Sequence, residues 1–179
     1  MKATGIVRRI DDLGRIVIPK EIRRTMRIRE GDPLEIFTDN EGDVIFKKYS
    51  PVGEMAGFFV QYAEVLSKTG GLPVIITDRD HIVAVAGLPK SKFLEQRISA
   101  QLEELIEQRR SYSYENNEKK LFPCEDMDRN ILVAATINSS GDANGAIMFL
   151  DSEPGTKVTQ TEIKLISTAA LFLARQMDE

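Results

Sequence analysis

The sequence contains one cysteine and one histidine among its 179 residues. A single Cys124 excludes an intrachain disulfide and a zinc site made of several thiolates, and a single His81 leaves too few ligands for an ordinary zinc centre. Asp126 and Asp128 are spaced acids in a polar segment, and such acids are usually solvated. We therefore predict no metal site. A small loop side chain explains Cys124 better than a redox thiol does, and turn chemistry explains His81 better than catalysis.

Long apolar runs are also missing from the chain. Charged residues interrupt the N-terminal segment before any signal-peptide core, and no later window approaches the roughly 18 apolar residues of a membrane span. The chain is therefore expected to be cytoplasmic and to make no membrane contact. Its length fits one large domain or two small ones, and a hydrophobic content of 42% is sufficient for ordinary globular cores.

Positive charge is concentrated at one end of the chain. Residues 1–29 contain nine Lys or Arg and three Asp or Glu, a balance of +6, whereas residues 30–50 carry -4 and residues 51–179 carry -6. Five arginines lie between Arg8 and Arg24. A solvated charged face is the alternative, but this concentration of cations predicts contact with a polyanion. Arginine suits forked hydrogen bonds to phosphates and to guanine edges.

The first 50 residues predict two hairpins around a short helix. Segments rich in Ile and Val flank a turn that contains Asp11, Asp12 and Gly14, and Pro19 ends the second segment. The expected elements are strands at 5–10 and 15–18, a helix at 20–26, and strands at 34–38 and 44–49.

An N-terminal unit this small offers few positions that can be wholly buried, so folding alone removes little surface from water. A second copy would supply the missing core. Interleaving the strands of two copies would also remove exposed sheet edges, which otherwise invite aggregation. We therefore predict an obligate dimer through this unit.

The rest of the chain predicts an α+β domain around an antiparallel sheet. Apolar residues recur at three- and four-residue steps in its helices, and Thr159 and Glu162 have capping-box spacing. The second helical region has a possible break near Ser99. The expected elements are helices at 54–67, 91–107 and 159–177, and strand pairs at 72–77 with 81–86 and at 131–138 with 143–151.

Two helices carry more apolar residues than covering one side of a sheet requires, so a face of each is expected to meet a partner chain. The residues assigned to this oligomerisation surface are Phe58, Phe59, Tyr62, Ile163, Ile166, Ala170 and Leu173. A ligand pocket under the segment 111–128 is predicted on the sheet face with Ile76, Val83, Val85 and Met148. A filled apolar core explains the same four residues equally well.

The run TGIVRRIDDLGRIVIPKEIRR, residues 4–24, closely resembles the AbrB-type DNA-binding domain, and the segments GDPLEIF and IFKKY continue the match to Tyr49. The resemblance implies a β-rich swapped-hairpin barrel formed by two chains, with arginines that face double-stranded DNA. The arginines that match by position are Arg8, Arg15, Arg23 and Arg24, with Lys2, Arg9 and Lys20 as basic neighbours.

Residues 54–179 resemble a GAF domain in the order of their helices and hairpins. The combination resembles a family of sporulation regulators that activate and repress genes, which implies a place on the nucleoid of the developing spore and a tetramer joined through the GAF domains. We expect an AbrB-type domain at 1–50, a linker at 51–56 and a GAF-like domain at 57–179.

The leading prediction is a sequence-specific DNA-binding transcriptional regulator that is not an enzyme. Its GAF-like domain would oligomerise and sense an unidentified small molecule, with no known cofactor. One alternative is an antitoxin, since the same barrel occurs in proteins that neutralise a toxin through an extended tail. A second is a GAF-domain sensor without direct gene control. A third, a methionine sulfoxide reductase with paired cysteines, is disfavoured by the single cysteine.

Overall fold

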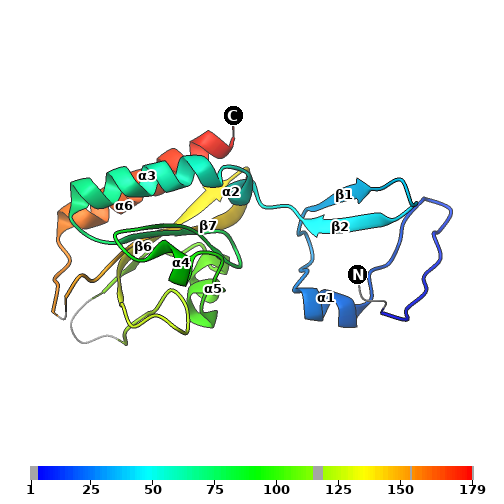
Figure 1. Ribbon diagram of the computed structural model, residues 1–179, viewed down its shortest axis with the longest axis horizontal. Helices are drawn as coiled ribbons and strands as arrows, with labels where there is room; N and C mark the ends of the chain where they lie inside the picture. Colours follow the sequence, from blue (N-terminus) through cyan, green and yellow to red (C-terminus); the bar gives the residue numbers. More distant parts are fainter. Residues whose placement is uncertain (1–3, 115–118, 154, 179) are drawn as a thin grey trace. The chain divides into compact units, whose positions relative to one another are not determined.

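The chain divides into two compact units, residues 1–49 and residues 50–179, in a computed structural model (Figure 1). The structure describes residues 4–114, 119–153 and 155–178. The predicted linker at 51–56 differs from what is found, because Pro51–Glu54 forms the short helix α2 and Val52 is buried in the second unit. The Ser50 side chain accepts a hydrogen bond from the Gly53 N–H, which caps this helix.

The first unit consists of a short helix and a two-stranded antiparallel sheet, besides the extended segment that precedes them. The helix ends where Arg27 adopts a left-handed conformation, with φ of 49°, and its N–H bonds back to carbonyls of the last turn. In the sheet Leu34 pairs with Lys48 and Thr38 with Val44. The elements are α1 (Lys20–Met26), β1 (Leu34–Thr38) and β2 (Val44–Lys48).

The hairpin predicted over residues 5–18 forms only at its turn. Asp11 accepts hydrogen bonds from the backbone of Leu13 and Arg15, and the Asp11 N–H donates to the Arg15 carbonyl. Residues 4–18 contain no strand, however, and their side chains are exposed except for Ile18, which is half-buried. A two-stranded ribbon is marginal in water unless one face packs on something. The prediction of two paired strands here is therefore wrong for the single chain.

The second unit is built on a five-stranded antiparallel sheet with the order β4-β3-β7-β6-β5. The longest pair, β6 and β7, is joined by Ser140 and Gly141, which both have positive φ, as the tight turn of a hairpin requires. The strands are β3 (Val74–Thr77), β4 (Ile82–Ala86), β5 (Tyr112–Ser113), β6 (Ile131–Ser139) and β7 (Asp142–Leu150).

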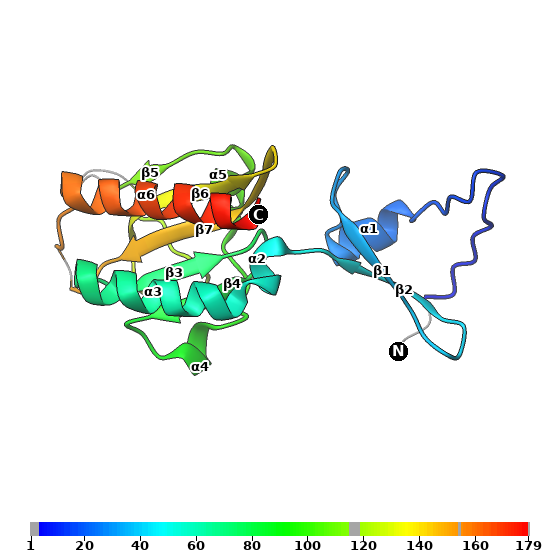
Figure 2. The ribbon, with the colours of Figure 1, turned by 90° about the horizontal axis from the view of Figure 1, so that it is seen from above.

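Helices cover both faces of this sheet. Two long helices, α3 and α6, lie side by side on one face, and the shorter α4 and α5 lie on the other (Figures 1 and 2). Each face has its own apolar core, one around Phe59 and Phe149 and the other around Leu102 and Met148. The helices are α3 (Ala56–Gly70), α4 (Lys90–Phe93), α5 (Ala100–Glu107) and α6 (Gln160–Met177).

The helical region predicted at 91–107 is two helices, α4 and α5, separated by a turn at Leu94 and Glu95 and a short segment that pairs with His81 at Arg97. Ser99 begins the second of them, because its hydroxyl accepts a hydrogen bond from the Leu102 N–H. The predicted capping box of α6 is present, with the Glu162 carboxylate accepting from the Thr159 N–H at 2.8 Å.

Candidate nucleic-acid interface and pockets

The predicted DNA-facing residues that the structure describes are all exposed. Arg8 and Arg9 lie in the extended segment before the turn, and Arg15 directly follows that turn. Lys20, Arg23 and Arg24 lie on α1. The remaining candidate, Lys2, lies outside the described residues. The exposed cations thus come from two separate segments of the first unit, the chain around the turn and helix α1.

Asp11 organises the turn from which Arg15 projects. Its Oδ1 accepts from the Arg15 N–H at 2.8 Å, and its Oδ2 accepts from Arg15 Nε at 2.8 Å. The backbone bond first, and then the guanidinium, hold the pKa of Asp11 below its usual value. The Arg15 side chain remains 69% exposed despite this ion pair. Its terminal guanidinium nitrogens can therefore still meet a phosphate or a base.

A buried carboxylate supports the C-terminal end of α1. The side chain of Asp32 is 1% exposed, and its Oδ2 accepts from the Arg29 N–H at 2.8 Å and lies 3.7 Å from Lys48 Nζ. Lys48 Nζ in turn donates to the Arg27 carbonyl at 3.0 Å, at the cap of the helix. We call this group the Asp32–Lys48 clamp. The sequence prediction did not assign a role to it.

The apolar side chains of the first unit are exposed along with its arginines. The described part of residues 1–49 contains no buried hydrophobic residue, and Val7 is 85% exposed. The large hydrophobic residues exposed in this unit are Ile6, Val7, Ile10, Leu13, Ile16, Val17, Met26, Ile36, Phe37, Val44, Phe46 and Tyr49. A surface of this kind normally marks an interface.

The four residues predicted to line one ligand pocket do not share a face of the sheet. Ile76 and Val83 pack in the core under α3 and α6, whereas Val85 and Met148 pack in the core under α5. Strand pairing alone separates Ile76, which pairs with Ala84 and Ile147, from Val85 and Met148, which both pair with Ile75. A β-bulge then displaces Val83, because Ile76 pairs with Ala84 and Thr77 pairs with Ile82, so Val83 is an extra residue. As a result, Val83 and its neighbour Ala84 both face the core under α3 and α6, and the regular alternation of β4 side chains between the two faces is interrupted. The four residues therefore do not line one pocket, and their assignment to a common site is corrected.

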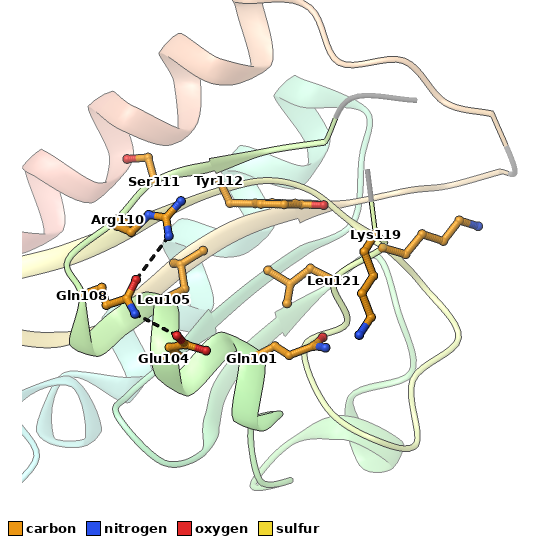
Figure 3. Close-up of a pocket in the computed structure, with 10 residues that line it drawn as sticks. Gln101, Glu104, Leu105, Gln108, Arg110, Ser111, Tyr112, Lys119 and Leu121 are labelled. Carbon is orange, nitrogen blue, oxygen red and sulfur yellow. Dashed lines mark hydrogen bonds between the residues drawn. The ribbon is translucent and has the colours of Figure 1, made fainter. Parts of the chain in front are cut away.

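A cavity of about 230 Å³ lies instead at the edge of the second unit, between α5 and β5 (Figure 3). The predicted covering segment contributes to it, and several of its side chains are charged. The lining residues are Gln101, Glu104, Leu105, Gln108, Arg110, Ser111, Tyr112, Lys119, Lys120 and Leu121.

The predicted oligomerisation residues fall into two groups. Phe59, Ile166, Ala170 and Leu173 are buried in the core of their own unit, so they do not present a face to a partner. In an amphipathic helix, the most apolar positions face the sheet of the same unit. The helical repeat therefore led to core residues being assigned to the oligomerisation surface. The half-buried residues are Phe58, Tyr62 and Ile163.

Aromatic rings cluster on α3 and α6, at the half-buried positions. The Tyr62 ring stacks on Phe172, with centroids 5.5 Å apart, and Phe58 lies 6.2 Å from Phe172. Phe172 is 42% exposed, and Leu171 beside it is 70% exposed. We call Phe58, Tyr62 and Phe172 the aromatic stripe. Phe172 is not among the residues that the sequence assigned to the oligomerisation surface.

Other candidate reactive groups have ordinary structural surroundings. Cys124 is buried beneath α5, and burial raises the pKa of its thiol. His81 is exposed at the start of β4, where its N–H donates to Asp78. Across the described residues, no three His, Cys, Asp or Glu side chains gather as metal ligands would. The search of the same residues finds no helix long and apolar enough to cross a membrane.

An exposed arginine surface on a small β-rich unit, followed by a GAF-like sheet domain, defines a two-domain transcriptional regulator. Residues 54–178 match the family model described as stage V sporulation protein T C-terminal, transcription factor. Residues 7–53 match the model described as antidote-toxin recognition MazE, bacterial antitoxin.

Individual relatives agree with these matches. Stage V sporulation protein T of Bacillus subtilis is 49% identical over 181 residues, covering 100% of both chains. The transition state regulatory protein AbrB of the same organism is 48% identical over 84 residues, covering 42% of this chain and 86% of its own. The chain therefore belongs to the stage V sporulation protein T family.

A solved structure supports the fold of the second unit. The GAF domain of the nutrient sensor CodY from Clostridium difficile, described as cofactor binding, is 13% identical with a TM-score of 0.50, and the match covers 66% of this chain and 83% of that one. At this identity the likeness concerns the fold alone. The predictions of an AbrB-type N-terminal domain and a GAF-like C-terminal domain are confirmed.

Proposed function

We propose that this sporulation regulator grips double-stranded DNA through Arg8, Arg15, Arg23 and Arg24, with Lys2, Arg9 and Lys20 as supporting cations. The observation that carries the proposal is that the four matched arginines are all exposed on a unit with a balance of positive charge. Phosphates of the duplex supply the complementary charge, and guanine edges accept the same forked donors. Whether a given gene is activated or repressed then depends on where its operator lies.

The DNA-binding form is an obligate dimer through the first unit. Two facts support this: the described part of residues 1–49 contains no buried hydrophobic residue, and residues 4–18 form no strand with any described part of the chain. Swapping these segments between two copies would give each a strand neighbour and form a closed barrel. The same event would place eight matched arginines on one particle.

Salt dependence tests the arginine assignment. If eight arginines neutralise phosphates, the logarithm of affinity should fall with the logarithm of salt concentration at a slope of about -7. Arg15→Ala and Arg24→Ala each remove two contacts per dimer and should reduce that slope by about 2. Arg175→Ala, in the second unit, is the matched control. Wild-type affinity and slope in both N-terminal variants would refute the site.

We propose further that the second units join dimers into tetramers through the aromatic stripe. Exposed aromatic rings are typical of the centre of an interface. Phe172→Glu should leave a folded protein that sediments as a dimer, because Phe172 is 42% exposed. Leu173→Glu serves as the contrast, since that side chain is fully buried and its replacement should unfold the unit. A tetramer that survives Phe172→Glu would exclude this interface.

An antitoxin function remains the second candidate because residues 7–53 match an antitoxin family model. Antitoxins of this kind act through an extended tail, whereas residues 50–179 form a folded unit with two cores. We therefore favour the regulator. Co-purification of a small toxin with the intact protein would reverse that choice.

We infer that the protein has no enzymatic activity and acts in the cytoplasm, on the nucleoid. The buried Cys124, with its raised pKa, is poorly suited to nucleophilic chemistry, and a transcription factor acts where its operators are. An assay for methionine sulfoxide reduction checks the first inference, and a fluorescent fusion checks the second. In this proposal, the second unit senses a small molecule and does not catalyse a reaction.

A further inference from the structure

The cavity between α5 and β5 has an apolar middle. Leu105 and Leu121 point toward one another beneath the ring of Tyr112 in Figure 3, and all three belong to the core that lies under α5. Leu121 is nearly buried, so this floor is continuous with the interior of the unit. A hydrocarbon segment placed here would be removed from water on several sides.

Cationic side chains lie at opposite ends of that apolar middle. Arg110 lies beyond Leu105, whereas Lys119 lies beyond Leu121 (Figure 3). Lys120 also lines the cavity. Among the described residues that line the cavity, Glu104 is the one acid and the net charge is +2, although residues 51–179 as a whole carry -6. The cavity therefore reverses the charge of the unit around it.

A chain of hydrogen bonds orients the cation at the first end. Glu104 accepts from Gln108 Nε2 at 2.8 Å, which turns the Gln108 carbonyl oxygen toward Arg110 Nη1 at 3.2 Å. The Arg110 backbone N–H also donates to the Leu105 carbonyl, which fixes the main chain at Arg110. The Glu104 carboxylate thus already accepts a hydrogen bond from the Gln108 amide. An arginine held at one nitrogen keeps other N–H groups for a carboxylate.

We propose that this cavity binds a small aliphatic dicarboxylate. One carboxylate meets Arg110, the other meets the lysines, and the short hydrocarbon chain lies between Leu105, Leu121 and the Tyr112 ring. Both carboxylates are ionised near neutral pH, so the ligand's charge of about -2 balances the lining. The proposal rests on the proposed role of the second unit as a sensor, and it names the ligand class.

Other ligand classes fit this arrangement less well. A monocarboxylate leaves the cations at one end without a partner, and an amine meets net positive charge. Inorganic phosphate satisfies one end and leaves the apolar middle empty. A volume of about 230 Å³ lies below the usual range for drug-sized ligands, which favours a compact molecule.

Calorimetric titration of the full-length protein with succinate tests the proposal. Succinate should bind with a dissociation constant of about 1 mM or lower. Succinamide, its neutral isostere, and butyrate, which has one carboxylate, should each bind at least about tenfold more weakly. Absence of succinate binding, or equal binding of succinamide, would overturn the assignment.

Single substitutions then locate the site. Arg110→Gln and Lys119→Gln should each weaken succinate binding about tenfold, with Arg110→Lys intermediate because it keeps the charge without the fork. Lys164→Gln, an exposed lysine on α6, is the matched control and should bind as the wild type does. Unchanged affinity in both pocket variants would show that succinate binds elsewhere and would also refute the proposal.

Operator binding by the same variants separates this proposal from the proposed function. Without succinate, Arg110→Gln should bind DNA as the wild type does, since it lies outside the first unit. Conversely, Arg15→Ala should lose DNA affinity and retain succinate binding. Failure of the succinate titration with intact DNA binding would overturn the ligand and leave the regulator in place.

Discussion

The two units of this chain solve the problem of burying apolar side chains in opposite ways. Residues 50–179 place Phe59, Phe149 and Ile147 in complete burial between sheet and helices, within one chain. Among the described residues of the first unit, no hydrophobic residue is buried, and the polar Asp32–Lys48 clamp supports the end of α1. The first unit is therefore shaped by local charge and turn chemistry, and its apolar surface is available to a partner.

The comparison explains why the arginines lie where they do. A buried core selects apolar residues on one face of every element, which restricts where cations can appear. Among the described residues of the first unit no hydrophobic residue is buried, and both α1 and the preceding segment leave their cations exposed. In the proposed dimer, the cations of these two segments would meet the same DNA duplex. Dependence on a partner and the display of charge are in this sense coupled.

The largest predicted effect distinguishes a self-contained core from an incomplete one. Phe149→Ala should destabilise the second unit by about 3–5 kcal/mol, because the residue is fully buried and its loss leaves a cavity. Leu94→Ala, at an exposed position, is the control and should cost far less. Denaturant unfolding monitored by circular dichroism measures both. A small effect of Phe149→Ala would mean that this core is loosely packed.

The second prediction concerns concentration. A fragment of residues 1–49 should unfold at a lower temperature as it is diluted, since each tenfold dilution of an obligate dimer removes about 1.4 kcal/mol. A fragment of residues 50–179 carrying Phe172→Glu, which keeps the buried Val52, should melt at a constant temperature. Calorimetry over a range of concentrations provides the measurement. Constant melting of the first fragment would contradict the proposed dimer.

Loss of the Asp32–Lys48 clamp should have a moderate effect. Lys48→Met removes the hydrogen bond from a charged donor to the Arg27 carbonyl, which should cost about 1.5 kcal/mol and loosen the end of α1. Lys47→Met, at the neighbouring exposed position, is the matched control. The readouts are dimer stability and operator affinity. Equal behaviour of the two variants would show that the clamp does not support the helix.

The smallest effects belong to charge and caps in the second unit. Thr159→Ala should cost about 1 kcal/mol as the cap of α6 is lost. The Thr159 side chain, with smaller contributions from backbone groups, holds the pKa of Glu162 low, and the hydroxyls of Ser139 and Ser140 do so for Asp178. A depressed pKa contributes stability above the unfolded value that is lost as pH falls through the folded value.

The melting temperature of the second unit should consequently decline as pH falls below about 4. Thr159→Ala should show a shallower decline, because part of the cause of the lowered pKa has been removed. Differential scanning calorimetry at a series of pH values checks the slope. Parallel declines in the variant and the wild type would assign the acid sensitivity to other groups.

Local signals in the sequence were sufficient where one segment determined the result. The capping pair Thr159 and Glu162 marks the start of α6, and turn residues mark the β6–β7 hairpin. The exposed arginines were likewise predictable, because their number within a short segment is unusual. In each case the chemistry lies within a few residues of the position that it explains.

Non-local features escaped the same reasoning. The bulge at Val83 shifts which side of the sheet a residue faces, and an alternating pattern does not reveal it. Asp32 reads as a solvated turn acid, yet the side chain of a lysine on β2 covers it. The segment before α1 has strand composition, but residues 4–18 form no strand, because composition does not reveal whether a neighbouring strand is present.

The boundary between the two units lies between two adjacent residues, Tyr49 and Ser50. The Tyr49 N–H donates to the Pro33 carbonyl within the first unit, while the Ser50 hydroxyl donates to Asp78 within the second. Adjacent residues thus hydrogen-bond within different units, so the peptide bond between Tyr49 and Ser50 is the point at which one unit ends and the other begins.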